Sequence, residues 1–326
     1  MKEEDLQRYF DEKITSFERI NHVGNNILYK VALPSGNKLL KKYSKFHAQN
    51  WPRGEREFKS LKYLWEMGFR EIPKPFGFYP KDNIGIYSFE DGRILKQEEV
   101  GEREILALSD FIVKLHSLDA RGFPIASTAV LCPDDYAKDL EIRIKNLEEQ
   151  SNHEKVNAEN KRFLYKDIAP FVKKLVVDFR KKYSKEELSK ELPLDQQRLN
   201  LGDFGIHNVL ISENKYVFLD FEYFGREDPV KELLGFLHHD KHLKISNDLK
   251  KKFVENYLRK TNAPASLEER MYAADPMKGA TFLLVYLNVL KSKYLEQLRG
   301  QGADIESVVQ ERIAKAKYKL ENISFF

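Results

Sequence analysis

The feature that most constrains the fold is a pair of short apolar runs between residues 208 and 221, set within a region of helical pattern. The runs read NVLIS and YVFLDF, and Glu213-Asn214 forms the turn between them, followed by Lys215. β-Branched and aromatic residues around a two-residue turn predict a β-hairpin with strands at 208–212 and 216–221. A hairpin returns the end of its second strand to the start of its first, so polar residues at these two points come together.

Three polar residues border this predicted hairpin. Asp203 precedes the first strand, Asn208 begins it, and Asp220 lies at the end of the second strand. Mg²⁺ prefers such oxygen ligands and is held against the nucleotide phosphates in phosphoryl transfer. We therefore predict Asn208 and Asp220 as metal ligands and Asp203 as the catalytic base for an attacking hydroxyl. An Asp and an Asn at this spacing also occur by chance, so the prediction depends on the strand–turn–strand context.

The first third of the chain predicts a small sheet with a helix. Residues 26–33, 37–43 and 84–89 are strand-like, and Pro34-Ser35-Gly36 suits the turn between the first two. After Pro52, apolar residues recur at helical spacing as far as Gly68, which predicts a helix there. Residues 3–14 have the pattern of a short polar helix.

Beyond about residue 102 the pattern is mostly helical. One predicted helix runs to His116, and Asp228-Pro229 predicts another helix start, with Asp as the N-cap. The chain is therefore predicted to be an α+β protein of two lobes. Residues 1–92 would form a small N-terminal β-sheet lobe with one helix, and residues 93–326 a larger, mainly helical lobe.

Composition narrows the class of protein. The sequence is 42% hydrophobic and 33% charged, and it has no apolar run long enough to span a membrane. The net charge of +4 is small and the Lys clusters are dispersed, which argues against a nucleic-acid partner. The charged N-terminus and the single cysteine, Cys132, are typical of a cytoplasmic protein without disulfides.

The stretch from Asp203 to Pro229 resembles the aminoglycoside phosphotransferase and choline kinase family, whose core is similar to that of protein kinases. The family's catalytic loop usually reads H-G-D-x-x-x-x-N, followed by D-F-E or D-x-D and then G-x-x-D-P. This chain has LGDFGIHN, then DFE, then Gly225 and Asp228-Pro229. LHSLD at 115–119 is similar to the helix ahead of that loop, and the resemblance extends over roughly residues 16–240.

The resemblance implies a transfer of the γ-phosphate of ATP, or of another nucleoside triphosphate, with Mg²⁺ as cofactor. It implies that Lys41 holds the α- and β-phosphates and that Glu57 pairs with this lysine. The segment 21–30 would be the loop over the phosphates, and 87–92 the hinge that binds adenine. The residues that the resemblance assigns to the nucleotide within these two segments are Gly24, Asn25, Tyr87 and Phe89.

Two departures from the family pattern stand out. Leu201 occupies the position usually held by His, and the phosphate loop has a single glycine, Gly24. Strand parity favours Lys41 over Lys42 as the phosphate-binding lysine, but leaves Lys42 as the alternative. Glu222 either reaches the metal or binds only backbone.

Several histidines lie near the predicted site. His207 is expected to hold the catalytic loop rather than to act as an acid or base. His238, His239 and His242 are spaced as metal ligands could be, but no cysteine lies nearby, so an ordinary helix-end cluster is the favoured interpretation.

The sequence thus predicts an ATP-dependent kinase of a small-molecule alcohol, such as a saccharide or amino sugar, with no membrane partner. A protein kinase is the rival, although an activation loop is missing between Asp220 and Asp228-Pro229. A non-catalytic, pseudokinase-like binding module is the third possibility, for which Leu201 is the best argument. Lys and His outnumber acids downstream of Glu232, which favours a neutral or anionic acceptor. The oligomeric state is not predicted.

Overall fold

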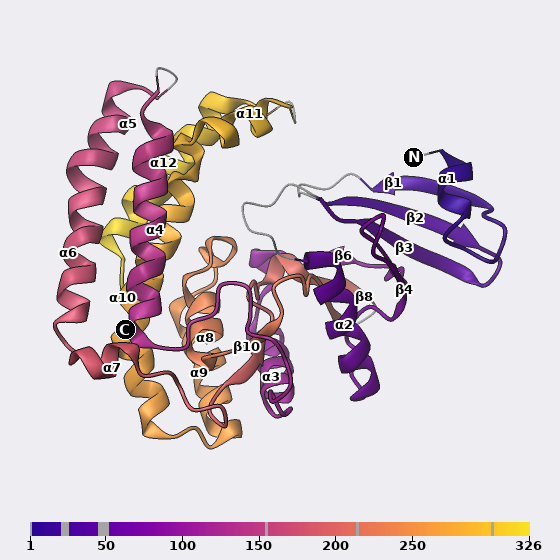
Figure 1. Ribbon diagram of the computed structural model, residues 1–326, viewed down its shortest axis with the longest axis horizontal. Helices are drawn as coiled ribbons and strands as arrows, with labels where there is room; N and C mark the ends of the chain where they lie inside the picture. Colours follow the sequence, from indigo (N-terminus) through magenta and orange to yellow (C-terminus); the bar gives the residue numbers. More distant parts are fainter. Residues whose placement is uncertain (1, 21–25, 45–51, 154–155, 213–214, 301–302) are drawn as a thin grey trace.

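The N-terminal part of the computed structural model is a five-stranded antiparallel sheet in the order β1-β2-β3-β5-β4. The structure describes residues 2–20, 26–44, 52–153, 156–212, 215–300 and 303–326. In Figure 1 the sheet forms one end of an elongated molecule and the long helices form the other. The strands are β1 (Ser16–Ile20), β2 (Ile27–Leu33), β3 (Gly36–Lys42), β4 (Pro75–Tyr79) and β5 (Ile84–Ser88).

The two faces of this sheet are covered by different helices. The short helix α1 (Glu3–Gln7) places Leu6 in a small core with alternate residues of β2, such as Val31. The longer helix α2 (Arg53–Glu66) buries Leu61 and Leu64 in the main core of the protein, where they meet Tyr87 of β5. The predicted turn at Pro34-Ser35 is confirmed, and Gly36 follows it with a φ of 115°, which glycine adopts without strain.

A second sheet joins the two parts. It consists of β6 (Arg93–Ile94), β8 (Val209–Ser212) and β9 (Lys215–Phe218), in the order β6-β8-β9. The register of β8 and β9, with Val209 opposite Phe218, confirms the predicted hairpin. The second strand ends earlier than predicted, because the chain leaves the strand before Asp220, which has a φ of 66°. A short pair, β7 (Arg198–Asn200) with β10 (Gly225–Glu227), flanks the loop after Asp220.

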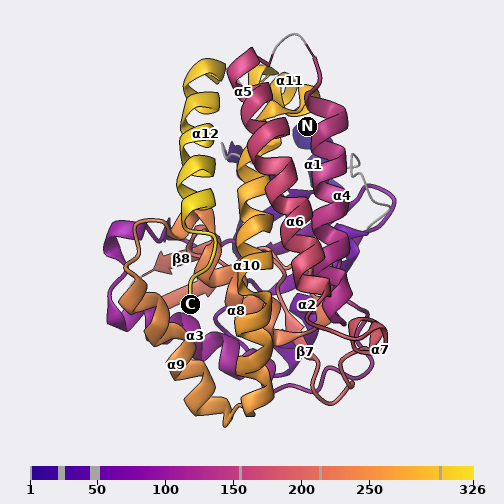
Figure 2. The same ribbon diagram turned by 90° about the vertical axis from the view of Figure 1, so that its left-hand side faces the viewer.

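The rest of the chain is helical, and α4, α6, α10 and α12 lie side by side in both views (Figures 1 and 2). Helix α3 is seen to end at His116, as predicted, and it packs against α9. The helices are α3 (Glu102–His116), α4 (Pro133–Ser151), α5 (Ala158–Arg162), α6 (Ala169–Arg180), α7 (Lys185–Ser189), α8 (Pro229–His238), α9 (Asn247–Thr261), α10 (Ala265–Tyr286), α11 (Ser292–Gly300) and α12 (Ile305–Glu321). Short 3₁₀ turns lie at Gln97–Glu99, Ile206–Asn208, Asp240–His242 and Leu287–Leu290, and a π-helical segment at Phe163–Ile168.

The predicted α+β fold, with an N-terminal antiparallel sheet and a larger helical part, is confirmed. The polar helix predicted over 3–14 ends at Gln7, because the Gln7 side chain bonds the carbonyls of Phe10 and Glu12 and so organises a loop instead. No helix within the described residues is both long and apolar enough to cross a membrane.

Candidate active site

Lys41 of β3 lies between two carboxylates from different parts of the chain. Its Nζ is 2.7 Å from Glu57 Oε2 on α2 and 3.1 Å from Asp220 Oδ1, just beyond β9. Burial alone would lower the pKa of Lys41, but Asp220 and Glu57 raise it well above its usual value. Lys42 projects from the opposite face of the strand, so the structure brings Lys41, and not Lys42, to these carboxylates.

Two tyrosine hydroxyls form a chain of hydrogen bonds that ends on Glu57. The Tyr43 hydroxyl donates to Glu57 Oε2 at 2.7 Å, and the Tyr87 hydroxyl lies 2.7 Å from that of Tyr43. The Tyr87 side chain is buried in this network, where it supports Glu57 through Tyr43. Phe89, the other predicted hinge residue, is half-buried, with Lys30 Nζ 4.5 Å from its ring centroid.

Hydrogen bonds hold Asn208 close both to Asp203 and to the end of the second hairpin strand. Its backbone carbonyl accepts the N–H of Leu219 at 2.8 Å, which brings it next to the residue before Asp220. Its side-chain Nδ2 donates to the Asp203 carbonyl at 3.0 Å. Among the described residues Asn208 Oδ1 accepts no hydrogen bond, so it could act as an oxygen ligand. Asp220 has the left-handed backbone conformation, which is uncommon for a residue other than glycine and is frequent at functional sites.

Glu222 connects the two parts of the chain. Its Oε1 accepts from Arg53 NH1 of α2 at 2.7 Å, and its Oε2 accepts from Asn26 Nδ2 at 3.2 Å. Burial and the neighbouring charge of Asp220 raise the pKa of Glu222. Carboxylate oxygens of Glu57, Asp220 and Glu222 all lie within 4.8 Å of one another, but Glu57 is paired with Lys41 and Glu222 with Arg53.

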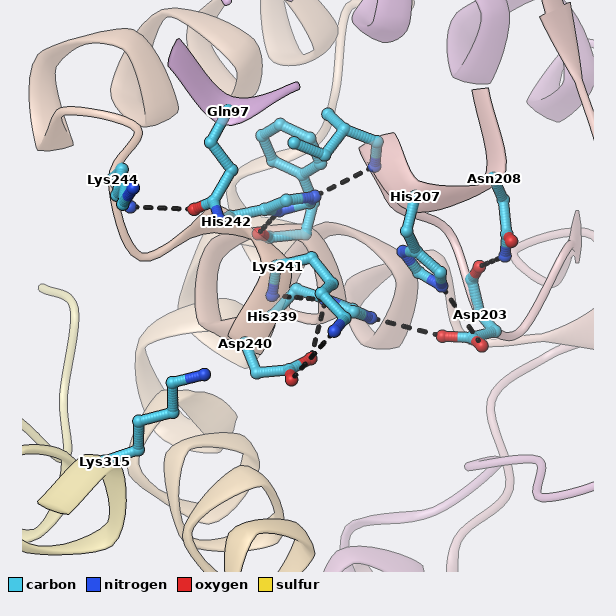
Figure 3. A network of polar contacts seen from close by, with 12 residues as sticks. Gln97, Asp203, His207, Asn208, His239, Asp240, Lys241, His242, Lys244 and Lys315 are labelled. Atoms are coloured by element: carbon cyan, nitrogen blue, oxygen red, sulfur yellow. Dashed lines mark hydrogen bonds and ion pairs between the residues drawn. The ribbon is translucent and has the colours of Figure 1, made fainter. Parts of the chain in front are cut away.

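The carboxylate of Asp203 lies beside two stacked imidazoles, as Figure 3 shows. His239, just after α8, places Nε2 3.3 Å from Asp203 Oδ1, and His207 places Nε2 3.6 Å from Oδ2. The Lys241 N–H donates to His239 Nδ1, so His239 Nε2 is the nitrogen with a proton to donate to Asp203. Burial alone would raise the pKa of Asp203, but the two imidazoles outweigh it and hold the pKa below its usual value.

The loop around Asp203 is fixed by two further side chains. Glu232 Oε2 accepts the backbone N–H groups of Leu201 at 2.8 Å and Gly202 at 3.3 Å. His242 Nε2 accepts the N–H of Ile206 at 3.1 Å, while its Nδ1 donates to the Phe236 carbonyl at 2.7 Å. This arrangement requires a neutral His242, in keeping with burial that lowers its pKa well below the usual value.

Sequence reasoning missed Glu232, His239 and His242 as residues of this site. The three histidines of the predicted helix-end cluster have separate partners: His238 binds Asp275, His239 lies against Asp203, and His242 holds Ile206. Gly24 and Asn25, assigned to the phosphate loop, lie outside the described residues.

A cavity of about 960 Å³ opens beside Asp203. Its walls are residues 127–130, α4, α10 and the loop that contains Asp203 and His207. Asn208 links Asp203 to the Lys41–Asp220 pair, because it bonds the Asp203 carbonyl and also the N–H of Leu219, the residue before Asp220. A hydroxyl compound in this cavity would therefore meet Asp203 next to the predicted metal ligands.

The fold and this arrangement of residues define a kinase-like phosphotransferase. The chain belongs to the phosphotransferase enzyme family, whose model matches residues 17–271. This membership confirms the prediction of a phosphotransferase made from the sequence.

Several solved structures have a similar fold. A choline kinase from Cryptosporidium parvum matches with a TM-score of 0.65 and 15% identity, over 97% of this chain and 92% of that one. A spectinomycin phosphotransferase in complex with ADP and spectinomycin matches with a TM-score of 0.63 and 12% identity, over 97% and 96%. A choline kinase from Streptococcus pneumoniae matches with a TM-score of 0.62 and 15% identity, over 98% and 97%. A search of curated proteins found no match.

Proposed function

We propose that this protein transfers the γ-phosphate of ATP to a hydroxyl group of a small molecule bound in the cavity beside Asp203. The observation that supports this most is that Asn208 bonds both Asp203, on the wall of an open cavity, and the residue before Asp220, which converges with Glu57 on Lys41. Two of the similar structures were solved with ADP bound, which supports a nucleotide as donor. Residues 1–92 would form the nucleotide lobe and 93–326 the lobe that holds the acceptor.

In the reaction, the acceptor hydroxyl oxygen forms a bond to the γ-phosphorus as the bond from that phosphorus to the β–γ bridging oxygen breaks, so ADP leaves. The hydroxyl proton passes to Asp203, whose lowered pKa keeps it ionised before the reaction. Lys41, positioned by Glu57, would neutralise charge on the α- and β-phosphates. Asn208 Oδ1 and Asp220 would hold Mg²⁺, which neutralises phosphate charge when bound.

The rival functions are less well supported. A protein kinase needs a segment after the metal motif that binds a polypeptide, whereas here Asp220 is followed at once by β10 and then α8. A pseudokinase would be expected to lack part of the catalytic set, whereas Asp203, Asn208 and Asp220 are all present. Leu201 itself does not impair the loop, because Glu232 bonds the backbone there.

The test is an ATP-consumption screen over alcohol acceptors, with the purified protein and Asp203→Asn as control. We expect acceptor-dependent ADP formation that Asp203→Asn lowers by about 10²- to 10⁴-fold, the usual contribution of a general base. Binding of MgATP should persist in the variant. If Asp203→Asn turns over like the wild type, Asp203 is not the base.

A further inference from the structure

The cavity beside Asp203 offers little to a cationic acceptor. All four aspartates on its walls already have partners. Asp135 accepts the N–H groups of Leu131 and Cys132, and Asp139 binds Arg143. Asp240 binds Arg312, and Asp203 faces two imidazoles. Seven Lys and Arg side chains lie on the same walls, and six of them are paired with carboxylates, which leaves the charge of Lys278 unpaired among the described residues.

Lys278 is a cation of this wall for which the described residues supply no ion-pair partner. It lies on α10, and it also lines a hollow of about 30 Å³ that Asp203 lines too, so the two side chains are near each other. Within the part of the chain that the structure describes, no carboxylate lies within 4.0 Å of its Nζ, which lies 5.4 Å from the centroid of the Phe282 ring. A partly buried cation left unpaired is unfavourable, and a ligand that supplies the opposite charge would stabilise it.

Burial and a neighbouring positive charge also make the charged form of Lys278 less favourable. Burial, reinforced by the charge of Lys231, lowers the pKa of Lys278 to about 8. Lys231 is already bound to Glu227 at 2.7 Å and to Thr128, so Glu227 offsets Lys278 only in part. A negatively charged ligand group beside Lys278 would stabilise its ammonium group against burial and the charge of Lys231.

Arg143 supplies a second anchor on the same wall. Its Nε is bound to Asp139 at 2.7 Å, and its side chain is one-third exposed, at 33%. The terminal NH groups make no hydrogen bond with the described residues. A guanidinium edge of this kind binds carboxylate or phosphate oxygens in a bidentate manner.

We propose that the acceptor is an anionic polyhydroxy compound, a sugar phosphate or a sugar acid, whose negative group binds Lys278 and Arg143 while a hydroxyl reaches Asp203. This rests on the proposed function of the same site. It distinguishes this chain from similar structures named for choline or ethanolamine, both cationic alcohols. The reaction is the one already described, with the anionic group unchanged in it.

The first experiment compares acceptors of different charge. Panels of sugar phosphates and sugar acids, of neutral sugars, and of amino sugars with choline and ethanolamine are assayed with MgATP at constant ionic strength. We expect the highest kcat/KM among the anionic compounds, and the two anionic panels tell phosphate from carboxylate. Lys278→Met should raise the KM for the anionic acceptor by about 10- to 100-fold, with little change in the KM for MgATP. A best acceptor from the neutral or cationic panel overturns the proposal.

The matched control is Lys145→Met on α4, a lysine whose side chain is 77% exposed and lies outside the cavity. It should leave the KM for the acceptor unchanged. If Lys145→Met raises that KM as much as Lys278→Met does, the effect comes from the net charge of the protein and not from Lys278 in the cavity, and the proposal fails. Absence of any MgATP turnover, even with water as acceptor, would instead count against the proposed function.

A second measurement does not depend on turnover. Competitive acetylation with acetic anhydride, read by peptide mass spectrometry, reports how accessible and how basic the Lys278 amine is in protein saturated with MgADP. Glucose 6-phosphate and gluconate should slow labelling of Lys278, while glucose and glucosamine at equal concentration should not. Equal protection by glucose, or no protection by either anion, would refute the assignment.

Discussion

Glu232 Oε2 accepts the backbone N–H of Leu201 at 2.8 Å, two residues before Asp203. The family pattern has His in place of Leu201, and the loss of that imidazole would be expected to loosen the loop. Here a carboxylate from the first turn of α8 bonds the loop backbone instead. The departure from the family pattern is therefore compensated within the fold.

Glu232→Gln should change how stability depends on pH. Burial, reinforced by the charge of Glu227, raises the pKa of Glu232 from 4.5 to about 7. Over this range the folded protein keeps a proton that the unfolded chain has released, so Glu232 contributes less stability as pH rises toward 7. Gln does not ionise, so the variant should gain stability relative to the wild type between pH 5 and pH 8, by on the order of 2 kcal/mol. Urea unfolding at the two pH values measures this.

The control for this experiment is Glu269→Gln, the same change at an exposed position of α10. A pH-dependent gain of the same size in the control would show that Glu232 is not its source. A gain that is constant from pH 5 to pH 8 would contradict the raised pKa.

Lys41→Met should lower kcat/KM by about 10²- to 10³-fold, the size expected when one charge that stabilises the transition state is lost. The reason is that Lys41 is the lysine of β3 that reaches both Glu57 and Asp220. Lys42→Met is the matched control and should cost little, because Lys42 projects from the other face of the strand. Steady-state ADP formation checks both variants, and an equal loss in both would mean that strand parity does not decide the role.

Local sequence signals predicted the parts of this site that lie close together along the chain. The hairpin follows from two β-rich runs and a turn, so the sequence could predict that Asn208 lies beside the end of the second strand. The stripe of apolar residues in α3 and the Asp228 N-cap are likewise local patterns, and the structure shows both. Strand β1 was missed because its residues alternate too weakly between buried and exposed to give a period of two.

The residues that were missed act over long distances in the sequence. Glu232 and His242 reach loop residues 31 and 36 positions away, and no local pattern encodes such a pair. His238, His239 and His242 look alike in sequence, and only the course of the chain at and beyond the end of α8 directs each to a different partner. The early end of β9 depends on the left-handed conformation of Asp220, which its residue type does not demand.

Asp275→Ala should destabilise the protein by about 3–5 kcal/mol, as expected when one member of a buried charged network is removed. Asp275 is fully buried on α10. It accepts from His238 Nε2 at 2.6 Å and from the backbone N–H groups of Phe325 at 2.6 Å and Phe326 at 3.2 Å. The substitution leaves these donors without a partner. Urea unfolding measures the loss, and Asp167→Ala, at an exposed position, should cost far less.

The last prediction separates the two roles that the sequence left open for Glu222. Glu222 binds Arg53 NH1 at 2.7 Å and Asn26 Nδ2 at 3.2 Å, so both of its oxygens already have partners from the N-terminal part. We therefore expect Glu222→Gln to leave the Mg²⁺ concentration for half-maximal activity nearly unchanged. Asp220→Asn should raise that concentration by at least about tenfold, as loss of a charged ligand does.

A double-mutant cycle tests the contact itself. If Glu222 acts mainly through Arg53, then Glu222→Gln and Arg53→Met should together cost less than the sum of their separate effects on kcat/KM. The coupling should be about 1–3 kcal/mol, since the two side chains touch and are largely buried. A Mg²⁺ requirement that rises as much in Glu222→Gln as in Asp220→Asn would instead make Glu222 a metal ligand, because loss of the Arg53 contact alone has no reason to change metal affinity to that extent.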